Sequence, residues 1–227
     1  FFDQWHVFGA CLRMKEGPGG CDVFVKLALS QISKQCGSDK RLLQTKEACQ
    51  TVLDALAANK YVGHGHSAEA VIAFVEPLRL ACDTKEPKLV VPALDCFQKL
   101  MAYRFIRNDI YCPRRRTAEG TLRTHSVLSS VVTTIASCLK IPNEPSVQLQ
   151  IIRCALTAVT DCEAHDNALQ TCLQCVFSLL LHSMETINQT TARLHLSQMV
   201  TCVFSRLESS ERKELQLPIP FIPDEAA

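Results

Sequence analysis

The sequence has almost no net charge and no long hydrophobic run, and these two absences exclude several classes of protein. Its 227 residues include 24 basic and 23 acidic side chains, so the formal net charge is only +1. A nucleic-acid-binding domain or a polybasic membrane-surface module would be strongly basic. Wholly apolar stretches are only a few residues long, for example at Leu179–Leu181, whereas a membrane span needs about 20 residues. We therefore expect no nucleic-acid binding and no insertion of the chain into a membrane.

Glycine is also scarce, with 8 residues, and there are 10 prolines. So few glycines over this length argue against a turn-rich β fold. Hydrophobic residues make up 47% of the chain and charged residues 21%, a composition typical of a globular chain that buries its own core. No GxSxG, HExxH, P-loop or GxGxxG motif occurs. We therefore expect a chain that is not an enzyme and that holds no cofactor.

Cysteine is unusually frequent, with 13 residues spread along the chain. An odd number cannot all pair within one chain, and most of these cysteines stand inside apolar stretches, where a free thiol behaves as a small buried hydrophobe. Disulfide frameworks belong mainly to short secreted domains, so we expect reduced thiols and an intracellular compartment. The sequence starts at Phe1 without a recognisable signal peptide, which leads us to expect a part of a larger protein.

Cys172 and Cys175 form a CxxC pair, the arrangement in this sequence that most resembles a metal or redox site. A zinc site needs four ligands, and no second CxxC or HxxxH lies at a matching spacing. Cys172 also shares the apolar side of an expected helix with Leu169 and Val176. We interpret the pair as core packing and expect no bound metal.

A helical period of apolar residues begins at Cys21 and continues to Glu208. Short polar or proline-containing breaks divide this stretch into eight expected helices. They span residues 21–36, 41–59, 67–82, 87–103, 120–139, 144–160, 165–183 and 186–208. Short connections make neighbouring helices antiparallel, and pairs that recur about every 40 residues are typical of HEAT and armadillo arrays. The sequence therefore predicts an all-α fold, an armadillo/HEAT-like irregular α-solenoid of about eight antiparallel helices.

The expected organisation has three parts: an irregular segment over residues 1–20, a helical domain over 21–209, and an extended, proline-containing tail over 210–227. Residues 104–119 are expected to form a loop. In the first helix the apolar period assigns Val23 and Leu27 to the core, together with Ile32 and Cys36. Ser38 is the expected cap of the second helix.

The helix expected over residues 87–103 has two distinct sides when its residues are placed at 100° per residue. The apolar side contains Val90, Ala93, Leu94, Phe97, Leu100 and Met101. The other side contains Lys88, Pro92, Asp95, Lys99 and Tyr103. Asp95 and Lys99 stand at i, i+4 spacing, which predicts a surface ion pair worth a few tenths of a kcal/mol. The same residues could form part of a partner's binding surface, and periodicity alone favours the simple ion pair.

Three separated blocks, Leu89–Tyr103, Val147–Thr160 and Ile187–Ala192, give a more specific indication. In sequence and in order they resemble the N-terminal dimerisation and cyclophilin-binding (DCB) domain of the large Arf guanine-nucleotide exchange factors of the trans-Golgi, the brefeldin-A-inhibited class. The resemblance covers roughly residues 21–209. It implies an armadillo-like helical module without the catalytic exchange domain, which lies further downstream in that family.

The resemblance also implies partners and a location. It implies self-association as a homodimer, contacts to the adjacent helical homology domain of the same chain, and recruitment by an Arf-like small GTPase. The protein would then be cytoplasmic and peripheral at trans-Golgi network membranes, held there only through its partners. Lys99 is where the resemblance places the GTPase contact, with Lys88, Asp95 and Tyr103 on the same stripe.

A second family stays open as an alternative. A non-catalytic scaffold of Golgi and endosome trafficking has the same N-terminal domain, and its characteristic turn is similar to Asp83–Lys88 here. The blocks at Val147–Ile152 and Ile187–Ala192 favour the exchange-factor branch. The cyclophilin contact, known for plant members, is not carried over to this chain.

Overall fold

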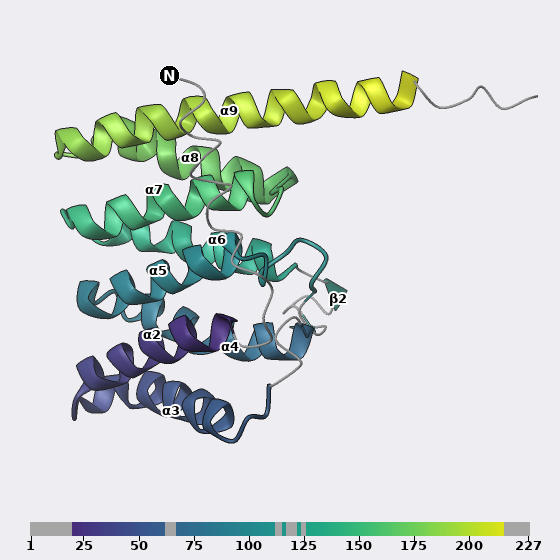
Figure 1. The fold of residues 1–227 in the computed structure, drawn as a ribbon. Coiled ribbons are helices and arrows are strands. Elements are labelled where there is room, and N and C mark those ends of the chain that lie inside the picture. The colour runs from purple at the N-terminus through teal and green to yellow at the C-terminus, as the bar shows by residue number, and fades with distance from the viewer. Residues whose placement is uncertain (1–19, 62–66, 112–114, 117–121, 124–125, 216–227) are drawn as a thin grey trace, which may run out of the picture.

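The computed structural model describes residues 20–61, 67–111, 115–116, 122–123 and 126–215. The eight α-helices of these residues form two layers (Figure 1). One layer consists of α2 (Gly20–Cys36), α5 (Pro87–Ala102), α7 (Pro145–Thr160) and α9 (Thr186–Leu215). The other consists of α3 (Leu43–Ala57), α4 (Ala68–Asp83), α6 (Val127–Ser137) and α8 (Asp166–His182).

The helices pair in chain order, and each pair packs on the next. The pairs α2–α3, α4–α5, α6–α7 and α8–α9 are joined across the layers, while α2, α5, α7 and α9 contact one another in succession within their layer. A single pair has too little apolar surface to close a core, and stacking buries the rest. The predicted all-α solenoid is confirmed, with one continuous core that runs through all four pairs.

Helix starts follow from local capping chemistry. The Ser67 hydroxyl accepts a hydrogen bond from the Ala70 amide at 3.2 Å, and the Ser126 hydroxyl accepts one from the Ser129 amide at 3.1 Å. Pro87 stands in the first turn of α5, where its missing N–H would have no partner. The expectation for Ser38 is wrong, because the neighbouring Asp39 carboxylate caps a short 3₁₀ turn, Lys40–Leu42, that precedes α3.

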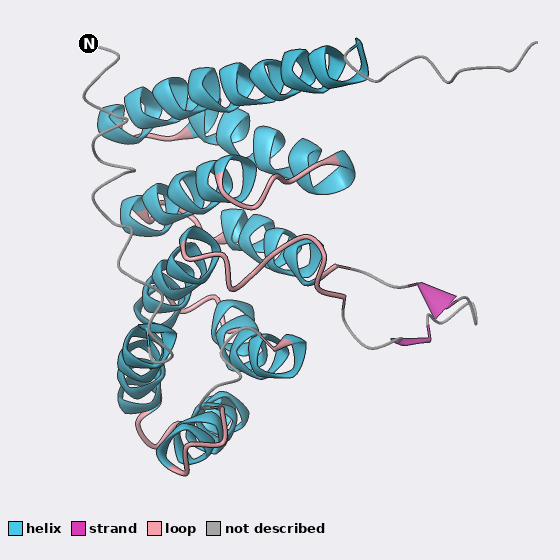
Figure 2. Ribbon diagram, turned by 45° about the vertical axis from the view of Figure 1, so that its right-hand side comes forward, coloured by secondary structure: helices cyan, strands magenta, loops and turns pink. Residues whose placement is uncertain are grey.

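The connection between α5 and α6 differs from the prediction. The helix expected over residues 120–139 starts only at Val127, after the Ser126 cap, and ends in a 3₁₀ turn, Cys138–Lys140. Strand β1 (Arg115–Arg116) pairs antiparallel with β2 (Leu122–Arg123), and Figure 2 shows the pair projecting from the helical layers. An isolated antiparallel β-bridge joins Tyr111 to Ser126, just before α6 begins. Backbone pairing of this kind, and not helix, is therefore found at Leu122–Arg123 and Ser126, where the first turns of the helix were expected.

The last helix also differs from the prediction, because α9 continues to Leu215 and includes the first residues of the expected tail. Of the expected irregular segment 1–20, only Gly20 is described, and it begins α2; residues 1–19, and residues 216–227 of the expected tail, lie outside the described residues. No helix in the described part of the chain is both long enough and apolar enough to span a membrane.

Helix α5 lies at the centre of the stack, because it packs against α2, α4 and α7. Nine of its side chains are buried, and they include Pro92. The sequence placed Pro92 on the solvent side, which is wrong because neighbours on three sides leave only a narrow stripe of the helix open. Cys154 of α7 donates its thiol to the Leu94 carbonyl at 3.2 Å, so α7 also contacts the α5 backbone.

We predict that Leu94→Ala lowers the free energy of unfolding by about 2–5 kcal/mol, because the fully buried side chain leaves a cavity between α5 and its neighbours. The matched change Leu27→Ala, at a side chain that is 66% exposed, should cost far less. Urea denaturation followed by circular dichroism measures both. Equal losses for the two variants would contradict the assignment of the core.

Candidate functional site

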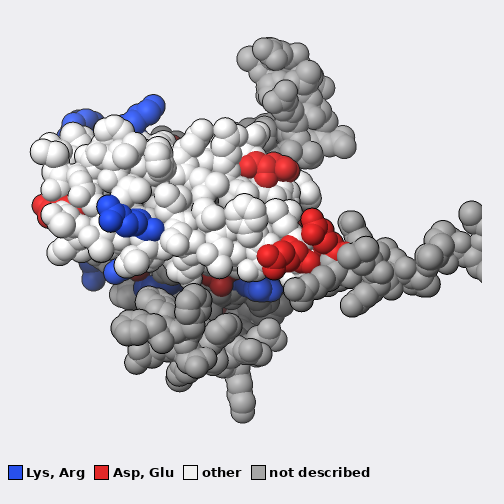
Figure 3. Space-filling view, turned by 90° about the horizontal axis from the view of Figure 1, so that it is seen from above, with Lys and Arg blue, Asp and Glu red and all other residues white. Residues whose placement is uncertain are grey.

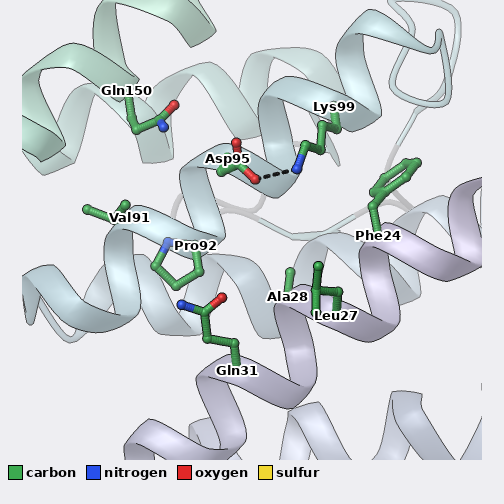
Figure 4. A pocket seen from close by; sticks show the side chains of 9 residues that line it. All are labelled: Phe24, Leu27, Ala28, Gln31, Val91, Pro92, Asp95, Lys99 and Gln150. Carbon is green, nitrogen blue, oxygen red and sulfur yellow. Dashed lines mark hydrogen bonds and ion pairs between the residues drawn. The ribbon is translucent and has the colours of Figure 1, made fainter.

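A groove lies where α2, α5 and α7 meet (Figure 4). It encloses about 180 Å³ and is lined by side chains from all three helices. They are Phe24, Leu27, Ala28 and Gln31 of α2, Val91, Pro92, Asp95 and Lys99 of α5, and Gln150 of α7. The groove follows from the packing of α5, whose open stripe faces the gap between its two neighbours in the same layer.

One rim of the groove has a pair of opposite charges. The Lys99 ammonium lies 2.7 Å from an Asp95 carboxylate oxygen, one turn apart on α5, so the predicted ion pair is confirmed. Both side chains are 40% exposed, which leaves water free to screen the pair. Such a pair contributes only a few tenths of a kcal/mol to folding. Its two charges therefore remain available to a partner that approaches along the groove.

The other rim is apolar and exposed. Leu27 of α2 lines the groove and is 66% exposed, and Val23, one turn before it on the same side of α2, is 72% exposed. The ring of Phe24, which also lines the groove, stacks on Tyr103 with centroids 5.7 Å apart. The sequence assigned Val23 and Leu27 to the core, which is wrong. The buried side of α2 contains Val25, Leu29 and Ile32 instead. Val23 and Leu27 point away from this side.

The structure brings together three of the four site residues expected from the sequence. Asp95 and Lys99 line the groove, and Tyr103, at the end of α5, is joined to it through Phe24. Lys88 is exposed at the start of α5 and does not line the groove. Its charge lies close enough to Asp39 to help lower the pKa of that carboxyl, after the larger effect of hydrogen bonds from Arg41.

Gln150 is a groove residue that the sequence gave no reason to select. Its side-chain oxygen is buried and has no hydrogen-bond partner among the described residues. A buried amide oxygen without a partner is costly, because it has lost its hydrogen bonds to water without gaining a donor from the protein. No local signal in the sequence marks Gln150, because its position depends on how α7 packs on α5.

The comparisons with known proteins fit this geometry. A family model described as the dimerisation and cyclophilin-binding domain, Mon2/Sec7/BIG1-like, matches residues 23–211, most of the chain. The chain belongs to the DCB family. The groove, the ion pair and the apolar rim all lie inside the matched region of this DCB domain.

Several curated relatives are exchange factors. Brefeldin A-inhibited guanine nucleotide-exchange protein 1 of Homo sapiens is 29% identical over 227 residues, which cover 88% of this chain and 12% of the relative. Brefeldin A-inhibited guanine nucleotide-exchange protein 3 of Arabidopsis thaliana is 30% identical, covering 79% of this chain and 10% of the relative. The ADP-ribosylation factor guanine nucleotide-exchange factor sec71 of Schizosaccharomyces pombe is 28% identical, covering 90% and 10%. The chain thus spans only 10–12% of the length of these three relatives.

The CxxC pair lies in the core of the DCB domain, as predicted. Cys172 and Cys175 are 2% and 4% exposed in α8. Burial is the main cause that raises the pKa of Cys172 to about 12 and that of Cys175 to about 11. Among the described residues no three His, Cys, Asp or Glu side chains gather as metal ligands.

We predict that Cys172 and Cys175 react with iodoacetamide at pH 8 at least about tenfold more slowly than Cys202, because the thiolate is the nucleophile and burial suppresses it. Cys202 is only half-buried in α9 and is the internal reference. Pulse labelling followed by mass spectrometry of the peptides gives the three rates. Equal rates for Cys172 and Cys202 would mean that the pair lies outside the core.

Proposed function

We propose that this DCB domain is a non-catalytic regulatory and targeting module of a large Arf guanine-nucleotide exchange factor, and that an Arf-like small GTPase binds along the groove between α2, α5 and α7. The observation that carries the proposal is the combination of the Asp95–Lys99 ion pair with an exposed apolar rim on one surface. The names of the curated relatives support the same assignment, since the human relative is a guanine nucleotide-exchange protein and the yeast relative is named as an ADP-ribosylation factor exchange factor.

The groove has the composition of a protein-binding surface. Exposed Val23 and Leu27 would cover the apolar centre of the interface, and the Phe24–Tyr103 stack offers a large rigid aromatic surface. Lys99 and Asp95 would supply charges that orient the partner and disfavour binding of other proteins with unsuitable charges. A small GTPase in its GTP state has ordered switch segments, which would present one defined surface for binding to the groove.

The proposal includes further partners and a place in the cell. The domain would self-associate as a homodimer, as the family description names dimerisation, and would contact the adjacent helical homology domain of the same chain. The GTPase would recruit the protein to the cytoplasmic side of trans-Golgi network membranes, with peripheral attachment only through partners. The relatives' names favour an exchange factor over the non-catalytic trafficking scaffold as the parent protein.

We predict that Lys99→Glu weakens binding of a GTP-loaded Arf-like GTPase about tenfold or more, a loss of about 1.4 kcal/mol, because it reverses a charge beside Asp95 at the rim. Leu27→Asp should have a similar effect through the apolar rim. Isothermal titration calorimetry measures the affinities. The melting temperature should stay within about 2 °C, since Leu27 is 66% exposed and the 40% exposed Lys99 makes only a solvent-screened ion pair.

The matched control is Arg79→Glu on α4, in the other layer. Arg79 makes ion pairs of the same kind, 2.6 Å from Asp83 and 2.7 Å from Glu76, but lies away from the groove. This variant should bind the GTPase as the unchanged domain does. Loss of binding in Arg79→Glu, or unchanged affinity in both groove variants, would remove the groove from the interface.

We predict that the domain alone does not accelerate nucleotide release from an Arf protein. No catalytic signature occurs in the sequence, and the family match assigns the chain to a domain other than the exchange domain. The assay is the release of a fluorescent guanine nucleotide from a loaded Arf protein, with and without an excess of the DCB domain. Clear acceleration would show that the domain has exchange activity of its own and would contradict the non-catalytic assignment.

A further inference from the structure

The last helix has a second apolar stripe, far from the groove, that faces solvent. Val200, Phe204 and Leu207 of α9 are 42%, 61% and 55% exposed. At 100° per residue these three side chains fall within about 60° of one another, so they form one stripe along the helix. Surface apolar residues that stand singly need no explanation, whereas a continuous stripe of large side chains marks an interaction site.

Helix α9 packs on the core through residues other than those of the stripe. Buried Ala192 and Met199 lie on a different side of the helix, roughly 100° around its axis from the centre of the stripe. The Asn188 amide donates to the Pro145 carbonyl at 3.0 Å, and the Arg206 guanidinium donates to the Val159 carbonyl. These contacts tie α9 to both ends of α7 and fix the direction in which the stripe points. Figure 3 shows this end of the molecule as largely uncharged.

The opposite end of the solenoid, at α3, has a mostly polar outer surface. The outward residues of α3 are mostly polar, and Gln50 donates to Asp54 at 2.8 Å across one turn of exposed helix surface. A polar outer face is what a terminal helix of a repeat stack needs in order to stay in solution by itself. The α9 end lacks such a face along its stripe, so it needs a partner.

Charges at the two ends of the stripe indicate what the partner is. Arg193 and Glu211, both exposed, fall on the same stripe at 100° per residue, with the three apolar side chains between them. If a second α9 lies antiparallel with its centre opposite residue 202, Val200 faces the partner's Phe204. In the same alignment Arg193 faces the partner's Glu211, at both ends of the pair. The stripe is therefore complementary to itself under a two-fold axis.

We infer that the DCB domain self-associates through this stripe, with α9 of one copy antiparallel to α9 of the other. The inference rests on the self-association proposed above and assigns a surface to it. Helices α8 and α9, of 17 and 30 residues, lie together at this end, and α8 adds exposed Phe177 and Leu181. At 1.5 Å per residue and about 10 Å of width they offer up to about 700 Å² per copy. A standard interface buries about 800 Å² per partner.

The test is a charge exchange measured by sedimentation equilibrium. Arg193→Glu and Glu211→Arg should each weaken the dimer about fivefold or more, because each places like charges opposite one another at both ends of the pair. The double variant R193E/E211R restores opposite charges and should recover most of the affinity. Phe204→Glu should give a monomer. All four substitution sets change exposed side chains, so circular dichroism and the melting temperature should match those of the unchanged domain.

Each outcome decides a separate point. A dimer whose strength is unaffected by Phe204→Glu and by the single charge reversals would overturn the α9 interface and leave self-association in place. A domain that stays monomeric at all concentrations would overturn both, as expected if another polypeptide segment covers the stripe. Weakening in both single variants without recovery in R193E/E211R would contradict the antiparallel alignment.

Discussion

The burial of α5 against α2, α4 and α7 is the constraint on which the rest of the structure depends. Three neighbouring helices enclose it, and they bury both Leu94 and Pro92. Only one narrow stripe of α5 then remains open, where Asp95 and Lys99 form their ion pair. The groove is therefore a product of the solenoid packing, and the residues beside it are placed by the core beneath them.

Much of the fold could be predicted from the sequence, because the helical period and the breaks between helices are local features. Ser67 and Pro87 mark helix starts through their own chemistry. The start of α6 at Val127 could not be predicted, since residues before it pair as short strands that the apolar period does not reveal. The sequence suggested Ser38 as the cap, and only the backbone path in the folded chain shows that Asp39 takes this position.

The site was only partly predictable for a different reason. Periodicity locates Asp95 and Lys99 on one side of a single helix, but it cannot show which other helix lies beside them. Val23 and Leu27 fit a helical period as well as the true core residues of α2 do, and their exposure appears only when the neighbours are in place. Gln150 enters the groove from a helix more than 50 positions further along the chain, a pairing that depends on the tertiary fold.

Hydrogen exchange of the whole domain tests the central claim most directly, that the α2–α5–α7 groove receives an Arf-like GTPase. Amide exchange would be followed by mass spectrometry with and without the GTP-loaded GTPase. The slowing of exchange should be largest in Gly20–Cys36 and Pro87–Ala102 and smaller in α7. Protection that appears on α3, α4 or α8 while α2 and α5 remain unchanged would contradict the claim.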